Sequence, residues 1–199
     1  MEYIKIYKKR VMINDGNLFL ESFNIKRISD IKRLKRDLHL NALYLEKNKI
    51  TEIEGLENLI DLKRLHLEAN YIREIKGLDT LVNLEDLELS GNQITRIEGL
   101  GNLLKLKELL LNANQIKRVE GLESLVNLEQ LDLSNNNITA IEGLENLKNL
   151  KYLNLSNNRI TEIDNLVGLI NLEVLEISNN QITNFESLEN IKNLKKVRK

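Results

Sequence analysis

The residues of this chain whose side chains could do chemistry are two histidines and a group of carboxylates. His39 and His66 are the only histidines, and cysteine is absent. A hydrolytic triad holds a nucleophile, an imidazole base and an acid within hydrogen-bond reach, and neither histidine has a serine and an acid placed in that way. The absence of cysteine excludes a disulfide, a thiolate metal site and a cysteine nucleophile. We therefore predict that the protein is not an enzyme and holds no cofactor.

His66 is the histidine with the more acidic surroundings. The side chains that it could approach are those of Glu68, Glu88 and Tyr44. One histidine with scattered acids on a flat surface lacks the enclosed geometry and the supporting hydrogen bonds of a metal site, so we predict an interface or surface histidine and no metal. Asp86 and Glu108 form a carboxylate pair, but there is no cleft to make either of them a general acid or base.

Asparagine recurs at a fixed interval of 22 residues, and this repeat defines the elements that must position those side chains. Between the asparagines, the pattern L-x-x-L-x-L-x-x-N-x-I-x-x-I-x-x-L-x-x-L runs from Leu62 to Leu81 and again from Leu128 to Leu147. Such a period is typical of a solenoid, and the pattern is identified as a leucine-rich repeat. We interpret the asparagines as a structural ladder that satisfies backbone groups. The column consists of Asn48, Asn70, Asn92, Asn114, Asn136, Asn158 and Asn180.

The fold class predicted from this pattern is an α/β solenoid shaped as an arc. In Leu-x-Leu the two leucines point one way and the residue between them the other, so each repeat contributes a short strand to a parallel sheet with an open concave face. After the asparagine the apolar spacing becomes three, which predicts short 3₁₀ or helical turns on the convex side. We interpret the residue before the third apolar position as a helix N-cap. That column runs Gly55, Gly77, Gly99, Gly121, Gly143, Asn165 and Ser187.

The chain divides into three parts. Asp15-Gly16, between Val11-Met12-Ile13 and Leu18-Phe19-Leu20, is a hairpin signal, and a blurred repeat follows it. The predicted parts are an N-terminal cap with a degenerate repeat at 1–39, seven 22-residue repeats at 40–193, and a truncated basic C-terminal strand at 194–199.

The consensus from Val119 to Leu128 resembles the 22-residue subfamily named after a leucine-rich-repeat regulatory subunit of protein phosphatase 1. Axonemal dynein light chains and bacterial internalins carry similar repeats. The resemblance implies protein binding, with a phosphatase as one candidate partner gripped by acidic and aromatic residues of the concave face. An adhesion protein of the internalin type is a third possibility. Two points stand against it: internalins typically have Pro-Leu where this chain has Gly-Leu, and they need export.

The net charge of −1 conceals a segregation along the chain. Residues 1–36 carry a net charge of +6, residues 37–191 of −12 and residues 192–199 of +5. A nucleic-acid binder needs a basic stripe on its broad face, so the acidic body excludes that class. No run approaches a membrane span, and the N-terminus lacks the apolar core of a secretory signal. We therefore expect a cytoplasmic protein.

The side chains on the concave face form the candidate binding site. Acids outnumber bases there, and outward apolar or aromatic residues accompany them, a mixture found in protein interfaces. We predict a protein–protein interaction module, an adaptor or regulatory subunit, that binds a basic segment or domain of another protein. The alternative is a structural or scaffold element acting through its end surfaces; we expect mainly a monomer, with weak end-to-end dimers. The candidate residues are Tyr44, Arg64, His66, Glu68, Asp86, Glu88, Glu108, Leu110, Asp132, Tyr152 and Glu176.

Overall fold

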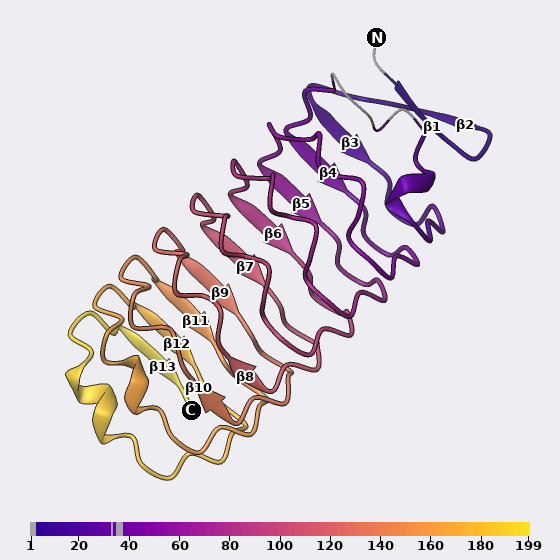
Figure 1. The fold of residues 1–199 in the computed structure, drawn as a ribbon. Coiled ribbons are helices and arrows are strands. Elements are labelled where there is room, and N and C mark those ends of the chain that lie inside the picture. Colours follow the sequence, from indigo (N-terminus) through magenta and orange to yellow (C-terminus); the bar gives the residue numbers. More distant parts are fainter. Residues whose placement is uncertain (1–2, 33, 35–37) are drawn as a thin grey trace.

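The computed structural model describes residues 3–32, 34 and 38–199, and in this range nine short strands stack into one parallel sheet (Figure 1). The order of its strands follows the chain, so each coil pairs with the coil before it and the coil after it. The predicted solenoid is confirmed. The strands of the sheet are β3 (Asn17–Phe19), β4 (Ala42–Tyr44), β5 (Arg64–His66), β6 (Asp86–Glu88), β7 (Glu108–Leu110), β9 (Gln130–Asp132), β11 (Tyr152–Asn154), β12 (Val174–Glu176) and β13 (Lys196–Arg198).

The register of the sheet follows from the constant repeat length. Because neighbouring coils are equally long, Leu65 lies opposite Leu87, and Leu87 lies opposite Leu109. These central leucines are fully buried, while the residues on either side of them face outward. The sheet is therefore covered on its inner face only, which is why its strands alternate instead of reading as continuous apolar runs.

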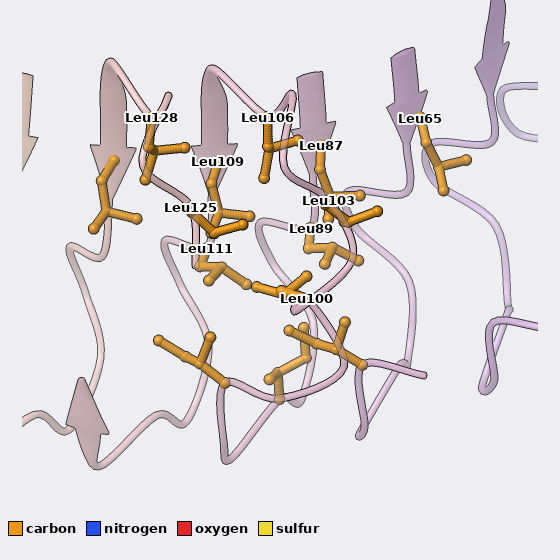
Figure 2. Packing of buried hydrophobic residues seen from close by; sticks show 14 of the residues in the cluster. Leu65, Leu87, Leu89, Leu100, Leu103, Leu106, Leu109, Leu111, Leu125 and Leu128 are labelled. Atoms are coloured by element: carbon orange, nitrogen blue, oxygen red, sulfur yellow. The ribbon is translucent and has the colours of Figure 1, made fainter. Parts of the chain in front are cut away.

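The core is a continuous column of leucine and isoleucine inside the coils. Figure 2 shows Leu87 and Leu109 from the strands together with Leu100 and Leu103 from the opposite wall of the coil, and all four are at most 1% exposed. Burying one such side chain contributes about 1.5–3 kcal/mol. A single coil has no second layer to cover these side chains, so each coil depends on its neighbours.

The buried asparagine column is the predicted ladder. Asn114 donates from Nδ2 to the carbonyls of Leu89 and Leu111 at 3.0 Å, and its Oδ1 accepts the backbone N–H of Ile94 at 3.0 Å. The same contacts recur at the other asparagines of the column, from Asn48 to Asn180. Each side chain therefore joins its own coil to the preceding one, and the prediction is confirmed.

A second asparagine column, which the sequence analysis missed, lies where each coil returns toward its strand. Asn127 donates from Nδ2 to the carbonyl of Leu104 in the coil before it, at 2.8 Å. Like the first ladder, this column ties neighbouring coils through backbone carbonyls. Its other members are Asn83, Asn149, Asn171 and Asn193.

The convex side differs from the prediction. Its glycines adopt positive φ angles, 69° at Gly99 and 73° at Gly121, a left-handed conformation that helix N-caps do not use. A Cβ on Gly121 would lie 2.5 Å from the carbonyl oxygen of Ile97. The N-cap interpretation is therefore wrong: the glycines allow a left-handed turn that passes close to the preceding coil.

The 3₁₀ helices occur in the coils that lack this glycine. They are η1 (Ile28–Asp30), η2 (Asp164–Leu166) and η3 (Glu186–Asn190), and the glycine position is occupied there by Asp30, Asn165 and Ser187. In two other coils the convex chain pairs instead as the short parallel strands β8 (Arg118–Val119) and β10 (Ala140–Ile141). Across the described residues, we find no helix of the length and apolar character that spanning a membrane requires.

The N-terminal hairpin lies earlier than predicted. It is formed by β1 (Tyr3–Ile6) and β2 (Lys9–Met12), which pair antiparallel. Asp15 and Gly16 do form a tight turn, closed by hydrogen bonds between Asn14 and Asn17, but the strand after it, β3, pairs with β4 of the solenoid. The reason is that Leu18 and Leu20 are fully buried in the core. That residues 1–39 act as a cap stays a prediction, and residues 1–2, 33 and 35–37 of that segment lie outside the described residues.

Oppositely charged residues alternate along the edge of the sheet, immediately before the strands. Lys107 pairs with Glu85 at 2.6 Å, Lys151 with Glu129 at 2.6 Å and Lys195 with Glu173 at 2.9 Å. Each ion pair connects two neighbouring coils. The column runs Lys63, Glu85, Lys107, Glu129, Lys151, Glu173 and Lys195.

Candidate protein-binding face

The concave face is built from the first and third residue of each strand and the residue two positions further on. Because the central residue points into the core, its neighbours point out. The structure places all the predicted site residues in these three positions, from Tyr44 on β4 to Glu176 on β12. Arg64 is exposed, whereas the other ten are partly buried between the side chains of adjacent strands.

Four carboxylates form the middle of this face, here called the acidic centre: Asp86, Glu88, Glu108 and Asp132. Asp86 lies opposite Glu108 in the sheet register, and Glu88 is two residues along the strand from Asp86. Burial raises the pKa of Glu88 and of Glu108, and the neighbouring carboxylates Asp86 and Glu88 raise that of Glu108 further. The carboxylates therefore raise the free energy of each other's charged forms.

Hydrogen bonds hold the carboxylates of the acidic centre in place. The backbone N–H of Ser90 donates to Glu88 at 2.9 Å, and the backbone N–H of Ser134 donates to Asp132 at 2.8 Å. Gln130 donates from Nε2 to Glu108 at 3.0 Å. These donors are neutral, so they orient the carboxylates without neutralising their charge.

His66 lies beside the acidic centre and carries a positive charge at neutral pH. Its Nε2 lies 3.1 Å from Asp86 Oδ2 and its Nδ1 lies 3.7 Å from Glu46 Oε1. The hydrogen bond to Asp86 and the contact with Glu46 raise the pKa of His66 from 6.5 to about 10. The predicted approach to Tyr44 is confirmed, with ring centroids 4.9 Å apart in an edge-on arrangement, but the hydrogen-bond partner is Asp86.

Aromatic rings extend the face beyond the predicted residues. Phe19 on β3 stacks on Tyr44, with ring centroids 4.6 Å apart and planes 4° from parallel, and Phe19 is 52% exposed. Sequence reasoning missed Phe19 because the interval from Phe19 to Tyr44 exceeds 22 residues. The alternation Leu18-Phe19-Leu20 is the signal that could have placed it on this face.

The far end of the face is less acidic than the sequence suggested. Arg198 on β13 donates from Nη1 to Glu176 Oε1 at 2.8 Å, so an intramolecular cation already compensates Glu176. Tyr152 lies on β11, the strand beside β12, and burial raises the pKa of its hydroxyl. Excess negative charge is therefore concentrated on β6, β7 and β9.

One group of described side chains has the spacing that a metal ion could use. Glu46, His66 and Glu68 each offer a donor atom, and these atoms lie within 4.8 Å of one another. The prediction that the acids around His66 are scattered is therefore wrong for Glu68. Glu46, which the sequence analysis did not place near His66, also lies beside the imidazole.

Comparison with family models identifies the class of protein. Leucine-rich-repeat models match residues 82–124, 126–168 and 171–194. Together with the 22-residue coils and the buried asparagine ladder, these matches show that the chain belongs to the leucine-rich repeat family. Leucine-rich repeats typically serve as modules that bind other proteins.

Two solved structures of bacterial internalins are similar to this chain. The internalin inlC2 of Listeria monocytogenes is 31% identical with a TM-score of 0.84, over 92% of this chain and 79% of the internalin. The internalin inlF of the same species is 29% identical with a TM-score of 0.78, over 87% of this chain and 51% of its own. A search of curated proteins gave no match.

A third similar structure contains a bound partner. The ectodomain of a plant membrane receptor kinase from Arabidopsis thaliana is 26% identical with a TM-score of 0.67, over 80% of this chain and 21% of the receptor, and was solved in complex with CASPARIAN STRIP INTEGRITY FACTOR 2.

Proposed function

We propose that this protein is an adaptor or regulatory subunit whose concave face binds a basic segment or domain of another protein. The observation that carries the proposal is the acidic centre, where burial raises the pKa values of Glu88 and Glu108 and repulsion from neighbouring carboxylates adds to this effect. A basic segment laid across the sheet would relieve that repulsion, and oppositely charged surfaces also speed association. The aromatic rings of Phe19 and Tyr44 offer apolar contact area beside the acids.

Charge reversal tests the proposal. Replacing Asp86, Glu88, Glu108 and Asp132 together by lysine should abolish capture of the partner from the source cell while the coils stay folded, and wild-type capture should weaken as salt rises. Capture by the variant at the wild-type level would place the interface elsewhere.

A matched control uses four acids on the convex side. Glu57, Asp79, Glu123 and Glu145 are exposed there, and reversing them to lysine changes the net charge by the same amount. This variant should capture the partner as wild type does. A loss in both variants would mean that total charge matters and the concave face does not.

The second candidate function is assembly through the ends. A hollow at the C-terminal end is lined by two glutamates, three lysines and the apolar residues Phe185, Leu188, Ile191, Leu194 and Val197, and β13 is the last strand of the sheet. An unpaired strand edge beside apolar side chains favours association. If assembly is the function, the concave reversal should leave complex formation intact and Val197→Asp should disrupt it.

Two finer points belong to the same proposal. The resemblance to a phosphatase regulator makes a phosphatase one candidate partner. The similarity to internalins supports adhesion as a further possible function. A cytoplasmic location is proposed from the absence of cysteine, and fractionation of the source cell tests it. Recovery outside the cytoplasm would favour the adhesion role.

A further inference from the structure

The group formed by Glu46, His66 and Glu68 contains two acceptors without donors. Glu46 Oε2 and Glu68 Oε2 are both shielded from solvent and have no hydrogen-bond partner among the residues that the structure describes. A buried carboxylate oxygen left without a donor or a cation is costly.

His66 does not satisfy these oxygens. Its closest approach to Glu46 is Nδ1 to Oε1 at 3.7 Å, which is too long for a hydrogen bond. Its other nitrogen, Nε2, lies 3.1 Å from Asp86. Nε2 donates its proton to Asp86, and Nδ1 lies on the side of Glu46. At neutral pH Nδ1 also carries a proton, which a metal ion bound there would displace into solvent. A carboxylate that fixes an imidazole in this way is the usual support of a metal-binding histidine.

Because Glu46 Oε2 and Glu68 Oε2 are enclosed by protein, only a small cation can reach them. The ammonium of a lysine or the guanidinium of an arginine would have to push side chains apart to reach oxygens that solvent does not reach. A bare metal ion is small enough to lie between three donor atoms that are within 4.8 Å of one another. The Glu46 side chain is 13% exposed and the His66 side chain 24%, so both side chains reach the concave surface.

We propose that Glu46, His66 and Glu68 form a binding site for a divalent transition-metal ion, with Asp86 orienting the imidazole. One nitrogen and carboxylate oxygens suit Zn²⁺ better than Mg²⁺ or Ca²⁺, which prefer oxygen alone. Three protein ligands leave at least one coordination position open. The proposal does not rest on the protein-binding function, because the site is complete within the free chain.

Equilibrium dialysis of the full chain against Zn²⁺ at physiological salt tests the site. Wild type should bind one Zn²⁺ per chain in a saturable manner and should prefer it to Mg²⁺. His66→Asn, Glu46→Gln and Glu68→Gln should each lower the affinity at least tenfold. Asp86→Asn should lower it by about 10- to 100-fold, as the loss of a supporting carboxylate does elsewhere.

The second histidine provides the matched control. His39 is exposed and lies 2.7 Å from Asp61, away from the proposed ligands, so His39→Asn should bind Zn²⁺ as wild type does. A measurement on wild type alone avoids any folding defect of the variants: Zn²⁺ should shift the imidazole ¹⁵N signals of His66 and leave those of His39 in place.

Three results would overturn the site. The first is the absence of saturable Zn²⁺ binding by wild type, which would mean that protons or water satisfy Glu46 and Glu68. The second is equal affinity of wild type and His66→Asn, which would indicate general attraction of cations to the acidic face. The third is a His66 NMR signal that does not respond to Zn²⁺.

Discussion

At the scale of single residues, the asparagine ladder shows how one side chain can satisfy backbone groups from two coils. An amide supplies two donors and an acceptor at one point, which a hydroxyl or a carboxylate cannot do. Asn114 uses these for Leu89, Leu111 and Ile94. Each coil has the same backbone groups to satisfy, so an asparagine recurs every 22 residues and the sequence period indicates its structural role.

Removing the amide should cost stability. We expect Asn114→Ala to lower the free energy of unfolding by about 1–3 kcal/mol, because it leaves buried backbone groups without partners. Glu108→Ala should change it by less than about 0.5 kcal/mol, because Glu108 lies on the open face of the sheet. Urea denaturation of both variants measures the difference, and equal effects would contradict the role assigned to the ladder.

The charge on His66 should make stability depend on pH. Because its pKa is raised in the folded state from 6.5 to about 10, the stabilisation is fully present below about pH 6.5 and is lost as the pH rises through about 10. We expect wild type to be more stable than His66→Asn by about 1 kcal/mol at pH 6, a value reduced for partial exposure.

Urea midpoints of wild type and His66→Asn at pH 6 and pH 10.5, with a metal chelator present, measure this effect. The difference in stability should shrink at the higher pH. A constant difference would show that the imidazole contributes by packing and not by charge.

The residue scale also marks a limit of sequence reasoning. The repeat columns assign Glu46, His66 and Asp86 to the concave face, but which pairs meet depends on side-chain rotamers that a column does not contain. For that reason Asp86 was not expected as the partner of His66. Likewise, the compensation of Glu176 by Arg198 requires knowing that β13 completes the sheet.

At the scale of elements, glycine decides the form of the convex turn. Coils with glycine before the third apolar position turn through a left-handed residue, and coils with Asp30, Asn165 or Ser187 there form 3₁₀ helix. The apolar spacing of three is the same in both, so periodicity alone could predict a short turn but not its conformation. The strands were predictable because alternation and period both specify them.

Substituting alanine for these glycines tests the assignment. Gly121→Ala should destabilise the protein by at least about 1–2 kcal/mol, the cost of a left-handed conformation for a residue with a Cβ, with the contact to Ile97 O adding to this. Gly101→Ala is the control, because a Cβ there would have nothing within 4 Å. Thermal melts of the two variants measure the contrast, and similar melting temperatures would refute it.

At the scale of the whole molecule, the two ends differ from the body in their net charge and in how the apolar core is covered. The hairpin of β1 and β2 buries Ile4 and Ile6 against the first coil. Residues 192–199 carry five basic side chains, whose like charges would repel the same end of a second copy. Lys195 pairs with Glu173 and Arg198 with Glu176, so intramolecular partners weaken that repulsion.

Light scattering across a salt series measures the association that this end allows. We expect a monomer at low salt, with weak end-to-end dimers as salt screens the remaining repulsion beyond about 8–10 Å. A tight dimer already at low salt would show that repulsion between the basic C-terminal ends does not prevent association, and it would favour assembly over the adaptor function.

The alternation of lysine and glutamate before the strands bears on how such a chain can change in length. Loss of the coil that carries Glu85 would leave Lys63 beside Lys107, and gain of one coil would likewise bring two like charges together. Loss or gain of two adjacent coils would keep lysine next to glutamate throughout. The backbone structure repeats with every coil, but the sign of the charge before the strand repeats only with every second coil. Duplication or deletion in evolution should therefore proceed by pairs of coils.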